Sequence, residues 1–291
     1  MPGPLGRVTA VSVAHESAAA LAGFLQALPS GLRLVVVDNA STDGGAALAR
    51  AAGAEVIRSE ANRGFGAGCN LGLDAVATEF ALLVNPDARL TVGAVAALVD
   101  AADAWPDAAI LAPMILGPGG GPVRSWDAGQ ARRRRLPRRR DAEPWPAGPI
   151  CAEFLSGACL LLRMSAGLRF DEAFFLFYED DELCAAARAA GHGLVLVPGA
   201  RVLHEGGRSS GPSRAIEALK ARHMAWSRLH FLAKRDGEAE ARREGLRQAR
   251  RLASKAVGHA LTLQRGKLGR NLAALRGTLA YLRGRGHGGA G

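Results

Sequence analysis

The sequence contains few cysteines, and no two of them form a CxxC pair. Cys69, Cys151, Cys159 and Cys184 lie among apolar or helix-forming residues instead. A disulfide framework or a zinc ribbon needs cysteines paired at short spacing, so both classes are disfavoured. We therefore expect four reduced, buried thiols in a cytoplasmic protein.

Long apolar runs are also missing. No stretch of about 18 consecutive apolar residues occurs, so no helix is expected to span a bilayer. The first residues, MPGPLGRVTAVSVAH, lack the charged-then-apolar pattern of a secretion signal. With 48% hydrophobic residues over 291 positions, the chain can nevertheless build a sizeable core.

Aromatic residues make up only 5% of the chain, and four of the fifteen lie between Phe174 and Tyr178. Four acids follow directly, from Glu179 to Glu182. Acids in the first turn of a helix stabilise its dipole and often do nothing more. We interpret Asp181 and Glu182 in this way and keep Glu179 and Asp180 as candidates for chemistry.

Acidic residues are fewer than basic ones. The chain has 37 Lys and Arg but only 27 Asp and Glu, which gives a formal net charge of +10. Part of the excess lies in ARRRRLPRRR, residues 131–140, and the rest is spread along the C-terminal third. Such a balance suits nucleic acid, an anionic membrane or a phosphorylated substrate. No aromatic residues are interleaved with these arginines, which argues against a surface for single-stranded nucleic acid.

The first half of the chain alternates apolar, β-branched runs with helix-forming stretches. Continuous apolar strands separated by helices predict an α/β fold whose mostly parallel sheet has helices on both faces. The expected strands are RVTAVSVAH, LRLVVVDN, AEVIRS, EFALLVNPD and DAAILAPMIL, then ACLLLR and two short strands within LVLVPGARVLHEGG. Ligands of such sheets bind beyond the carboxyl ends of the strands.

Two segments depart from this pattern. Residues 117–149 are rich in Gly, Pro and Arg without a strand or helix period, which predicts a mobile loop. We expect a main domain over 1–236 and a basic, amphipathic helical tail over 237–291. The tail suits a membrane interface, and it equally suits packing on the main domain or on a second copy in a homodimer.

Polar groups follow several expected strands at the edge where ligands bind. VVVDNASTDGG places Asp38 at a strand end, where it suits either a nucleotide contact or a turn before a helix N-cap. In LLVNPDARL the apolar strand is followed by Asn85 and Asp87, whose side-chain oxygens suit Mg²⁺. This ion typically takes one or two carboxylates, and phosphates and water complete its shell. An ordinary Asn-Pro turn is the alternative.

Glycines open a later helix in NRGFGAGCNLGL. Gly64 and Gly66 would let backbone N–H groups approach a phosphate at the helix N-terminus. Asn62 and Arg63 add side-chain donors for a diphosphate. A tight turn explains the same glycine pattern.

Six motifs occur in one order along the chain, namely VDNASTDGG, NRGFGAGCNLGL, LLVNPDARL, FLSGACLLLR, FDEAFFLFYEDDELCAAARAAG and VLHEGGRSSG. Together they resemble the family 2 glycosyltransferases with a GT-A fold, and most of all their bacterial rhamnosyltransferase-like branch. The similarity runs from about residue 8 to about residue 236. It implies inverting transfer of a sugar from a nucleotide-diphosphate donor to an acceptor hydroxyl, with Mg²⁺ or Mn²⁺ as cofactor.

The resemblance also implies roles on the donor side. Asp38 matches the acid that contacts the nucleotide base, and His15 lies in the first-strand loop near that base. Asp87 matches the metal-binding acid, and Asn85 stands where many members carry a further Asp. His204 matches a histidine that completes the metal shell, although a loop histidine often serves only as a surface hydrogen-bonding group.

On the acceptor side, Gly157 and Ala158 match the loop that lines the acceptor. Asp180 matches the general base, which removes the proton of the attacking hydroxyl. Glu179 is interpreted as a positioning contact, and Tyr178 as part of an aromatic wall. Glu16 stands where an Asn is usual, which is a departure from the family pattern in the first donor loop.

The expected function is therefore transfer from a dTDP- or UDP-linked sugar, rhamnose first, to a cell-surface glycan that is lipid-linked. We expect the enzyme to lie at the inner face of the membrane and to bind no nucleic acid. A sugar-phosphate nucleotidyltransferase would want a Gly-rich, basic loop after the first strand, and SVAHESAAA has none. A basic nucleic-acid-binding protein would leave Asp87, Asp180 and His204 unexplained.

Overall fold

The computed structural model describes residues 3–127, 144–204, 206 and 213–288. The chain divides into two compact units, the first comprising Met1–Ala61, Gly68–Phe170 and Asp180–Ser209, and the second Asn62–Ala67, Asp171–Glu179 and Ser210–Gly291. The boundary expected after residue 236 thus falls inside the second unit, because the helices on either side of it pack together.

A nine-stranded sheet forms the centre of the first unit. Its order is β3–β2–β1–β4–β10–β6–β11–β5, with β8 also paired to β11. The strands are β1 (Val8–Ala14), β2 (Arg33–Asp38), β3 (Glu55–Arg58), β4 (Phe80–Val84), β5 (Ala88–Leu90), β6 (Ala108–Leu116), β8 (Ile150–Cys151), β10 (Cys159–Arg163) and β11 (Gly193–His204). Strands β1 to β4 run parallel wherever they pair, as do β6 and β11, whereas β10, β5 and β8 are antiparallel to their neighbours. The predicted, mostly parallel α/β sheet is confirmed.

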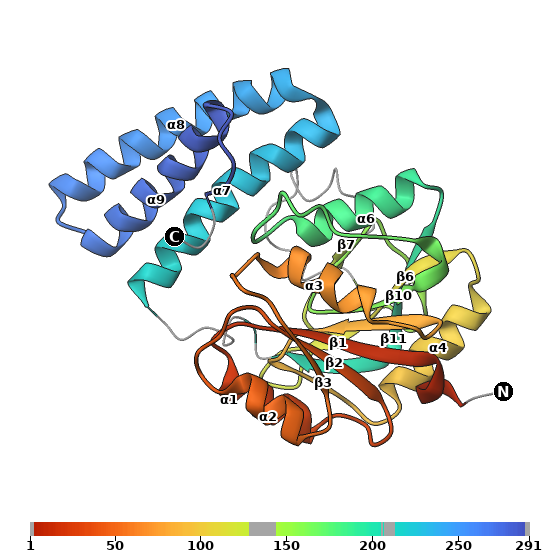
Figure 1. The fold of residues 1–291 in the computed structure, drawn as a ribbon. Coiled ribbons are helices and arrows are strands. Elements are labelled where there is room, and N and C mark those ends of the chain that lie inside the picture. Colours follow the sequence, from red (N-terminus) through yellow and green to blue (C-terminus); the bar gives the residue numbers. More distant parts are fainter. Residues whose placement is uncertain (1–2, 128–143, 205, 207–212, 289–291) are drawn as a thin grey trace. The chain divides into compact units, whose positions relative to one another are not determined.

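Successive side chains along each strand point to opposite faces of the sheet, and this alternation gives each face its own helices. On one face, Val36 of β2 shares a buried cluster with Leu21 of α1 (Ala18–Gln26) and Leu98 of α4 (Ala94–Ala104). On the other face lies α3 (Phe65–Asp74) (Figure 1). It approaches the sheet so closely that a Cβ at Gly72 would meet the side chain of Val11. Two further helices lie between strands along the chain, α2 (Gly45–Ala51) and α6 (Glu179–Ala189).

Three long helices make up most of the described second unit, and they pack side by side (Figure 1). They are α7 (Arg214–Asp236), α8 (Glu238–Leu261) and α9 (Arg265–Leu282). Their apolar contact is small and includes Trp226, Leu229 and Tyr281. Between residues 213 and 288 the chain is almost wholly helical, in agreement with the helical tail predicted from residue 237 on.

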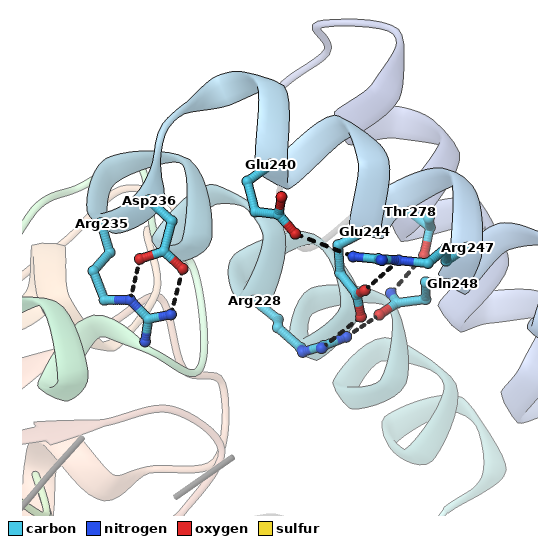
Figure 2. A network of polar contacts seen from close by, with 8 residues as sticks. All are labelled: Arg228, Arg235, Asp236, Glu240, Glu244, Arg247, Gln248 and Thr278. Carbon is cyan, nitrogen blue, oxygen red and sulfur yellow. Dashed lines mark hydrogen bonds and ion pairs between the residues drawn. The ribbon is translucent and has the colours of Figure 1, made fainter. Parts of the chain in front are cut away.

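A polar network ties the three helices together (Figure 2). Arg228 of α7 donates to Glu244 of α8 at 2.7 Å and to Gln248 of α8 at 2.5 Å. Gln248 in turn donates to the hydroxyl of Thr278 in α9 at 2.8 Å. Charge-assisted hydrogen bonds of this kind are stronger than neutral ones, so the network supplements the small apolar core.

The structure corrects several details of the predicted elements. The segment expected to hold two short strands is one strand, β11, whose register with β6 shifts between Val197 and Arg201. Cys151 is exposed, whereas the other three cysteines are buried, and burial raises the pKa of the Cys159 thiol to about 12. Within the expected loop over 117–149, β7 (Trp126–Asp127) pairs with β9 (Phe154–Leu155), and residues 128–143 lie outside the described part.

No helix among the described residues combines the length and apolar character needed to cross a membrane.

Candidate active site

Neighbouring strands bring several predicted site residues to one edge of the sheet. In the register of β1 and β2, Ala14 lies opposite Asp38, so His15 follows β1 next to the end of β2. Strand β4 pairs with both β1 and β10, and its last residue, Val84, lies opposite the first residue of the antiparallel β10. Asn85 and Ala158 therefore meet at this edge, where the Asn85 N–H donates to the Ala158 carbonyl at 3.0 Å.

Asp38 lies at the end of β2 with only 2% of its surface exposed. Its Oδ1 accepts the N–H of Ser41 at 2.9 Å, and Arg58 lies 3.7 Å from its Oδ2. Beside it, the His15 Nδ1 lies 2.9 Å from the carbonyl oxygen of Asn39. The structure therefore brings together the two residues expected near the nucleotide base, and it also shows the turn that was the alternative interpretation of Asp38.

The loops after β1 and β2 are cross-linked by two further acids. Glu16 accepts the Thr42 N–H at 2.8 Å, so the residue that departs from the family pattern joins the two loops. Asp43 accepts the N–H of Ala18, the first residue of α1, at 2.6 Å and that of Gly45 at 3.0 Å. Sequence reasoning offered a turn after Asp38 but missed the bond between Asp43 and α1, because a contact between separate loops leaves no local pattern.

The two predicted metal ligands lie side by side. Strand β5 pairs antiparallel with β11, and this register sets His204 opposite Ala88, the residue after Asp87. The His204 Nε2 lies 3.2 Å from the Asp87 Oδ1, and the Asp87 side chain is 4% exposed. The three-residue β5 was not predicted, although it is the element that creates this pair.

The chemistry of this pair fits a divalent ion. A carboxylate suits Mg²⁺ or Mn²⁺, and imidazole nitrogen suits the transition metal. Among the described residues, no group of three or more His, Cys, Asp or Glu side chains is arranged to hold a metal. Asp87 and His204 would therefore supply part of a coordination shell, and the phosphates of a donor with water would supply the remainder.

Asp180, the predicted base, lies at the start of α6. Its Oδ2 accepts the N–H of Gly157 at 3.0 Å, and its Oδ1 accepts the N–H of Asp181 at 3.0 Å. Gly157 precedes Ala158, whose carbonyl accepts the N–H of Asn85. A short series of backbone hydrogen bonds thus joins the predicted base, the predicted acceptor loop and the end of β4.

A buried thiol helps to fix α6 against this loop. The Cys184 Sγ accepts the N–H of Leu155 at 3.4 Å and approaches the Leu155 carbonyl at 3.5 Å. Leu155 lies two residues before Gly157, so the contact anchors the same loop that holds Asp180. Sequence reasoning had assigned Cys184 only to the core, and nothing in its spacing indicates the loop contact.

The remaining predicted donor residues belong to the second unit. The Asn62 Oδ1 accepts the N–H of Gly64 at 3.0 Å, and Arg63 pairs with Glu172 at 2.6 Å on the surface. Gly64 has φ +90°, and a Cβ there would meet the carbonyl of Phe175, so this position requires glycine. Gly66 is buried near the start of α3.

Tyr178 and Glu179 also belong to the second unit. Tyr178 has φ +68° and follows Phe177 with φ +69°, a left-handed backbone that large residues rarely adopt. The Tyr178 ring lies 5.6 Å from that of Phe231 in α7. Glu179 is 7% exposed at the first position of α6. These two strained residues directly precede the predicted base, and strain of this kind is common at active sites.

Comparisons with known proteins identify the family and the fold. The family model for glycosyl transferase family 2 matches residues 11–166. A Mycobacterium tuberculosis N-acetylglucosaminyl-diphospho-decaprenol L-rhamnosyltransferase is 29% identical, in a match that covers 72% of this chain and 81% of the relative.

Two solved glycosyltransferase structures share the fold. The mannosyltransferase PcManGT of Pyrobaculum calidifontis, in complex with GDP-Man and Mn²⁺, has a TM-score of 0.56 at 14% identity, with 97% of this chain and 89% of that one covered. S. aureus TarS 1–349, in complex with UDP-GlcNAc, has a TM-score of 0.53 at 16% identity, with coverage of 96% and 92%. The sheet is thus a GT-A fold, and with more than half of its length matched by the family model, the chain belongs to glycosyl transferase family 2.

Proposed function

We propose that this family 2 glycosyltransferase moves a sugar, with inversion, from a dTDP- or UDP-linked donor to a hydroxyl of a cell-surface glycan. Rhamnose is the first candidate sugar, because the relative at 29% identity is named as an L-rhamnosyltransferase. The name of that relative also contains a diphospho-decaprenol group, which supports a lipid-linked acceptor for this chain. The fold relatives bound to GDP-Man and UDP-GlcNAc support a nucleotide-sugar donor of some kind.

The observation that carries this proposal is the hydrogen bond from the Gly157 N–H to Asp180. Backbone N–H groups hold a carboxylate in one orientation without giving it a proton, which is what a general base requires. In the proposed reaction, the acceptor oxygen bonds to the anomeric carbon while the bond to the leaving diphosphate breaks. The proton of the attacking hydroxyl passes to Asp180, and a single displacement of this kind needs no enzyme nucleophile.

The donor would be held by residues from several loops. Asp38 and His15 would contact the nucleotide, and Asn85 would line the donor side near them. Asn62 and Arg63 would donate to the diphosphate, with the backbone N–H groups around Gly64 and Gly66 contributing at the start of α3. The Arg63 pair with Glu172 is exposed on both sides, so it contributes little and the arginine can exchange partners.

Asp87 and His204 would hold the divalent cation on the donor side. A bound Mg²⁺ or Mn²⁺ neutralises the charge that develops on a leaving diphosphate. Glu179 would position the acceptor beside Asp180, with Gly157, Ala158 and Tyr178 forming the acceptor side.

A donor screen tests the proposal. The full chain would be incubated with dTDP-, UDP- and GDP-linked sugars and Mn²⁺ or Mg²⁺, and release of the nucleoside diphosphate would be measured. Binding would be read in parallel as a rise in melting temperature, because a ligand that binds only the folded state stabilises it. We expect sugars linked to one class of nucleotide to give both release of the nucleoside diphosphate and a rise in the melting temperature of the protein. If no donor gave either result, the proposal would be refuted.

The two alternatives raised by the sequence, a nucleotidyltransferase and a basic nucleic-acid-binding protein, gain no support from the family match.

A further inference from the structure

The surplus positive charge of the chain is concentrated at its C-terminal end. Residues 245–291 contain ten Lys and Arg and no Asp or Glu. The preceding 244 residues contain 27 basic and 27 acidic side chains, so their formal charge is zero. The net charge of +10 therefore belongs entirely to the end of α8, to α9 and to the residues that follow.

The connection between α8 and α9 exposes large apolar side chains among these cations. Leu261 and Leu263 are each 81% exposed, and Val257, one turn earlier in α8, is 61% exposed. Lys255 and Arg265 are exposed on either side of them. We refer to residues 255–270 as the α8–α9 corner. A soluble surface tolerates single exposed leucines, but an apolar cluster within a cationic segment indicates a binding surface.

The backbone at this corner does not favour leucine. Leu263 has φ +54°, a left-handed conformation in which Gly or Asn is far easier to accommodate. A turn selected only for stability would carry one of those residues. The large apolar side chain at Leu263 is therefore unexplained by the folding of the turn.

The residues at the start of α9 are also unfavourable for the stability of this helix. Its first turn contains Arg265 and Lys267 and no acidic residue. Cations at a helix N-terminus are repelled by the positive end of the helix dipole, where acids are the favoured residues. Residues that break local rules without benefit to the fold mark functional positions. Three such departures, the exposed leucines, the left-handed Leu263 and the cationic first turn, coincide at one corner.

We propose that the α8–α9 corner docks onto a membrane surface that contains anionic lipid. Leu261 and Leu263 enter the boundary between headgroups and acyl chains, and the lysines and arginines around them contact the lipid phosphates. Residues 238–280 contain no Phe, Trp or Tyr, so the corner lacks the stacking groups of a single-stranded nucleic-acid surface. Docking of this kind would bring the enzyme to the surface where a lipid-linked acceptor lies, but it does not depend on which donor or acceptor is used.

Vesicle co-sedimentation of the full chain tests the docking without any sugar nucleotide. Vesicles of phosphatidylcholine alone would be compared with vesicles containing phosphatidylglycerol as well. We expect binding to the anionic vesicles only, and we expect it to weaken at high salt because the phosphate contacts are screened. The double variant Leu261→Ser/Leu263→Ser should bind at least about 10-fold more weakly, since its apolar anchors are lost.

Matched controls separate the corner from general effects. Val92→Ser removes a fully exposed apolar side chain of the first unit and should leave vesicle binding unchanged. The variant Arg265→Gln/Lys267→Gln should weaken binding, whereas Arg33→Gln/Arg50→Gln, an equal loss of exposed charge in the first unit, should not. All these side chains are exposed, so circular dichroism should show unchanged folding.

Either of two results would overturn the proposal. The wild-type chain would fail to sediment with anionic vesicles, or the double leucine variant would sediment with them as the wild type does. If, in the second case, the leucine variant also changed the sedimentation coefficient of the chain or its retention on an oligonucleotide, the corner would be assigned to a second copy or to nucleic acid. If the donor screen showed no activity and no binding, the vesicle measurements would still be valid. The proposed sugar transfer and the proposed membrane docking can therefore be refuted independently.

Discussion

Carboxylates at the edge of the sheet and carboxylates in the helical bundle have different partners. At the sheet edge, Asp38 and Asp180 accept backbone N–H groups from Ser41 and Gly157. In the bundle, Glu244 accepts charged groups, and two arginines surround it. A backbone N–H orients a carboxylate but leaves its charge in place, whereas a guanidinium neutralises it. The comparison separates the acids proposed for binding and chemistry, which backbone N–H groups orient, from an acid that two close arginines hold in the bundle, although Arg58 also lies 3.7 Å from Asp38.

This difference has a direct electrostatic consequence in the bundle. Burial acts to raise the pKa of Glu244, but the bond from Arg228 and the charges of Arg228 and Arg247 outweigh burial, so the pKa of Glu244 lies below its ordinary value. Asp171 shows the same balance. Burial acts to raise its pKa, but the hydrogen bond and the charge of Lys234 outweigh burial, so the pKa of Asp171 is also lowered. Groups with lowered pKa stabilise the fold above their unfolded pKa, and that stability is lost as the pH falls through the folded value.

The largest expected effect comes from removing the charge of an acid at the sheet edge. Asp180→Asn keeps the shape of the side chain but removes its capacity to accept a proton. We expect sugar transfer to fall by about 10²–10⁴-fold. Donor binding, measured by calorimetry, should change by less than a factor of a few, because Asp180 is proposed to act on the acceptor.

The matched control is the neighbouring substitution Asp181→Asn. Asp181 is interpreted as a helix-start residue, so its variant should retain most of the activity. If the two variants lost activity equally, or if Asp180→Asn transferred sugar at a near-normal rate, the assignment of the base would be wrong.

A second, smaller effect is expected at the Asp87–His204 pair. Asp87→Asn should raise the Mn²⁺ concentration needed for donor binding by at least about 10–100-fold, the range seen when a metal site loses even an outer partner. His204→Ala should act in the same direction but less strongly, because the carboxylate charge remains. Calorimetric titration of Mn²⁺ in the presence of the nucleoside diphosphate measures both, and an unchanged affinity in both variants would remove these residues from the metal site.

In the bundle the expected effects concern stability, and α9 offers a matched pair of glycines. A Cβ at Gly277 would meet the backbone carbonyl of Arg222 in α7, whereas one at Gly269 would meet nothing within 4 Å. Gly277→Ala should therefore destabilise the protein by about 1–3 kcal/mol through overpacking. Gly269→Ala should stabilise it by about 0.5–1 kcal/mol through the better helix propensity of alanine.

Far-UV circular dichroism during thermal unfolding can measure both glycine variants. The two shifts in melting temperature should have opposite signs, and equal shifts would mean that α9 does not approach α7 at Gly277.

The smallest expected effect is a pH dependence at the C-terminal end. The His287 ring lies 5.5 Å from that of Phe175, 5.7 Å from that of His223 and 5.7 Å from that of Trp226. Burial lowers the pKa of His287 below its ordinary value of 6.5, and the charges of Arg222 and His230 lower it further. The neutral ring is therefore favoured in the packed segment.

For this histidine the sign of the effect is set by the lowered pKa. Above pH 6.5 the ring is neutral whether packed or free, so packing carries no penalty. As the pH falls through the folded value, protonation disfavours the packed state relative to the free one, and the segment loosens. Amide hydrogen exchange of residues 283–288 should become a few-fold faster, after correction for intrinsic rates, and His287→Phe should abolish the change.

Much of the fold is predictable because the first half of the chain carries strong local signals. Apolar, β-branched runs separated by helical stretches are enough to indicate β1 to β4 and β6. The strands that sequence reasoning missed are short: β5 has three residues, and β7, β8 and β9 have two each. Such strands have no period of their own: β5 and β8 form on the longer β11, whereas β7 and β9 pair with each other.

The candidate site is predictable for a different reason. Asp38 and Asn85 can be located from strand ends, since carboxyl ends of parallel strands share an edge. The roles proposed for Asp180 and His204, by contrast, come only from the resemblance to a family. Contacts such as Asp43 with Ala18, or Cys184 with Leu155, join loops distant in sequence, and no local pattern reveals them.

The pairing of β5 with β11 has a consequence for the order of events during synthesis. Asp87 emerges from the ribosome with the first half of the sheet, but its partner His204 comes at the end of the last strand. A nascent chain that stops before β11 already contains the first donor loops and yet lacks the histidine. The proposed metal site would therefore be completed late in translation, only after the final strand has joined the sheet.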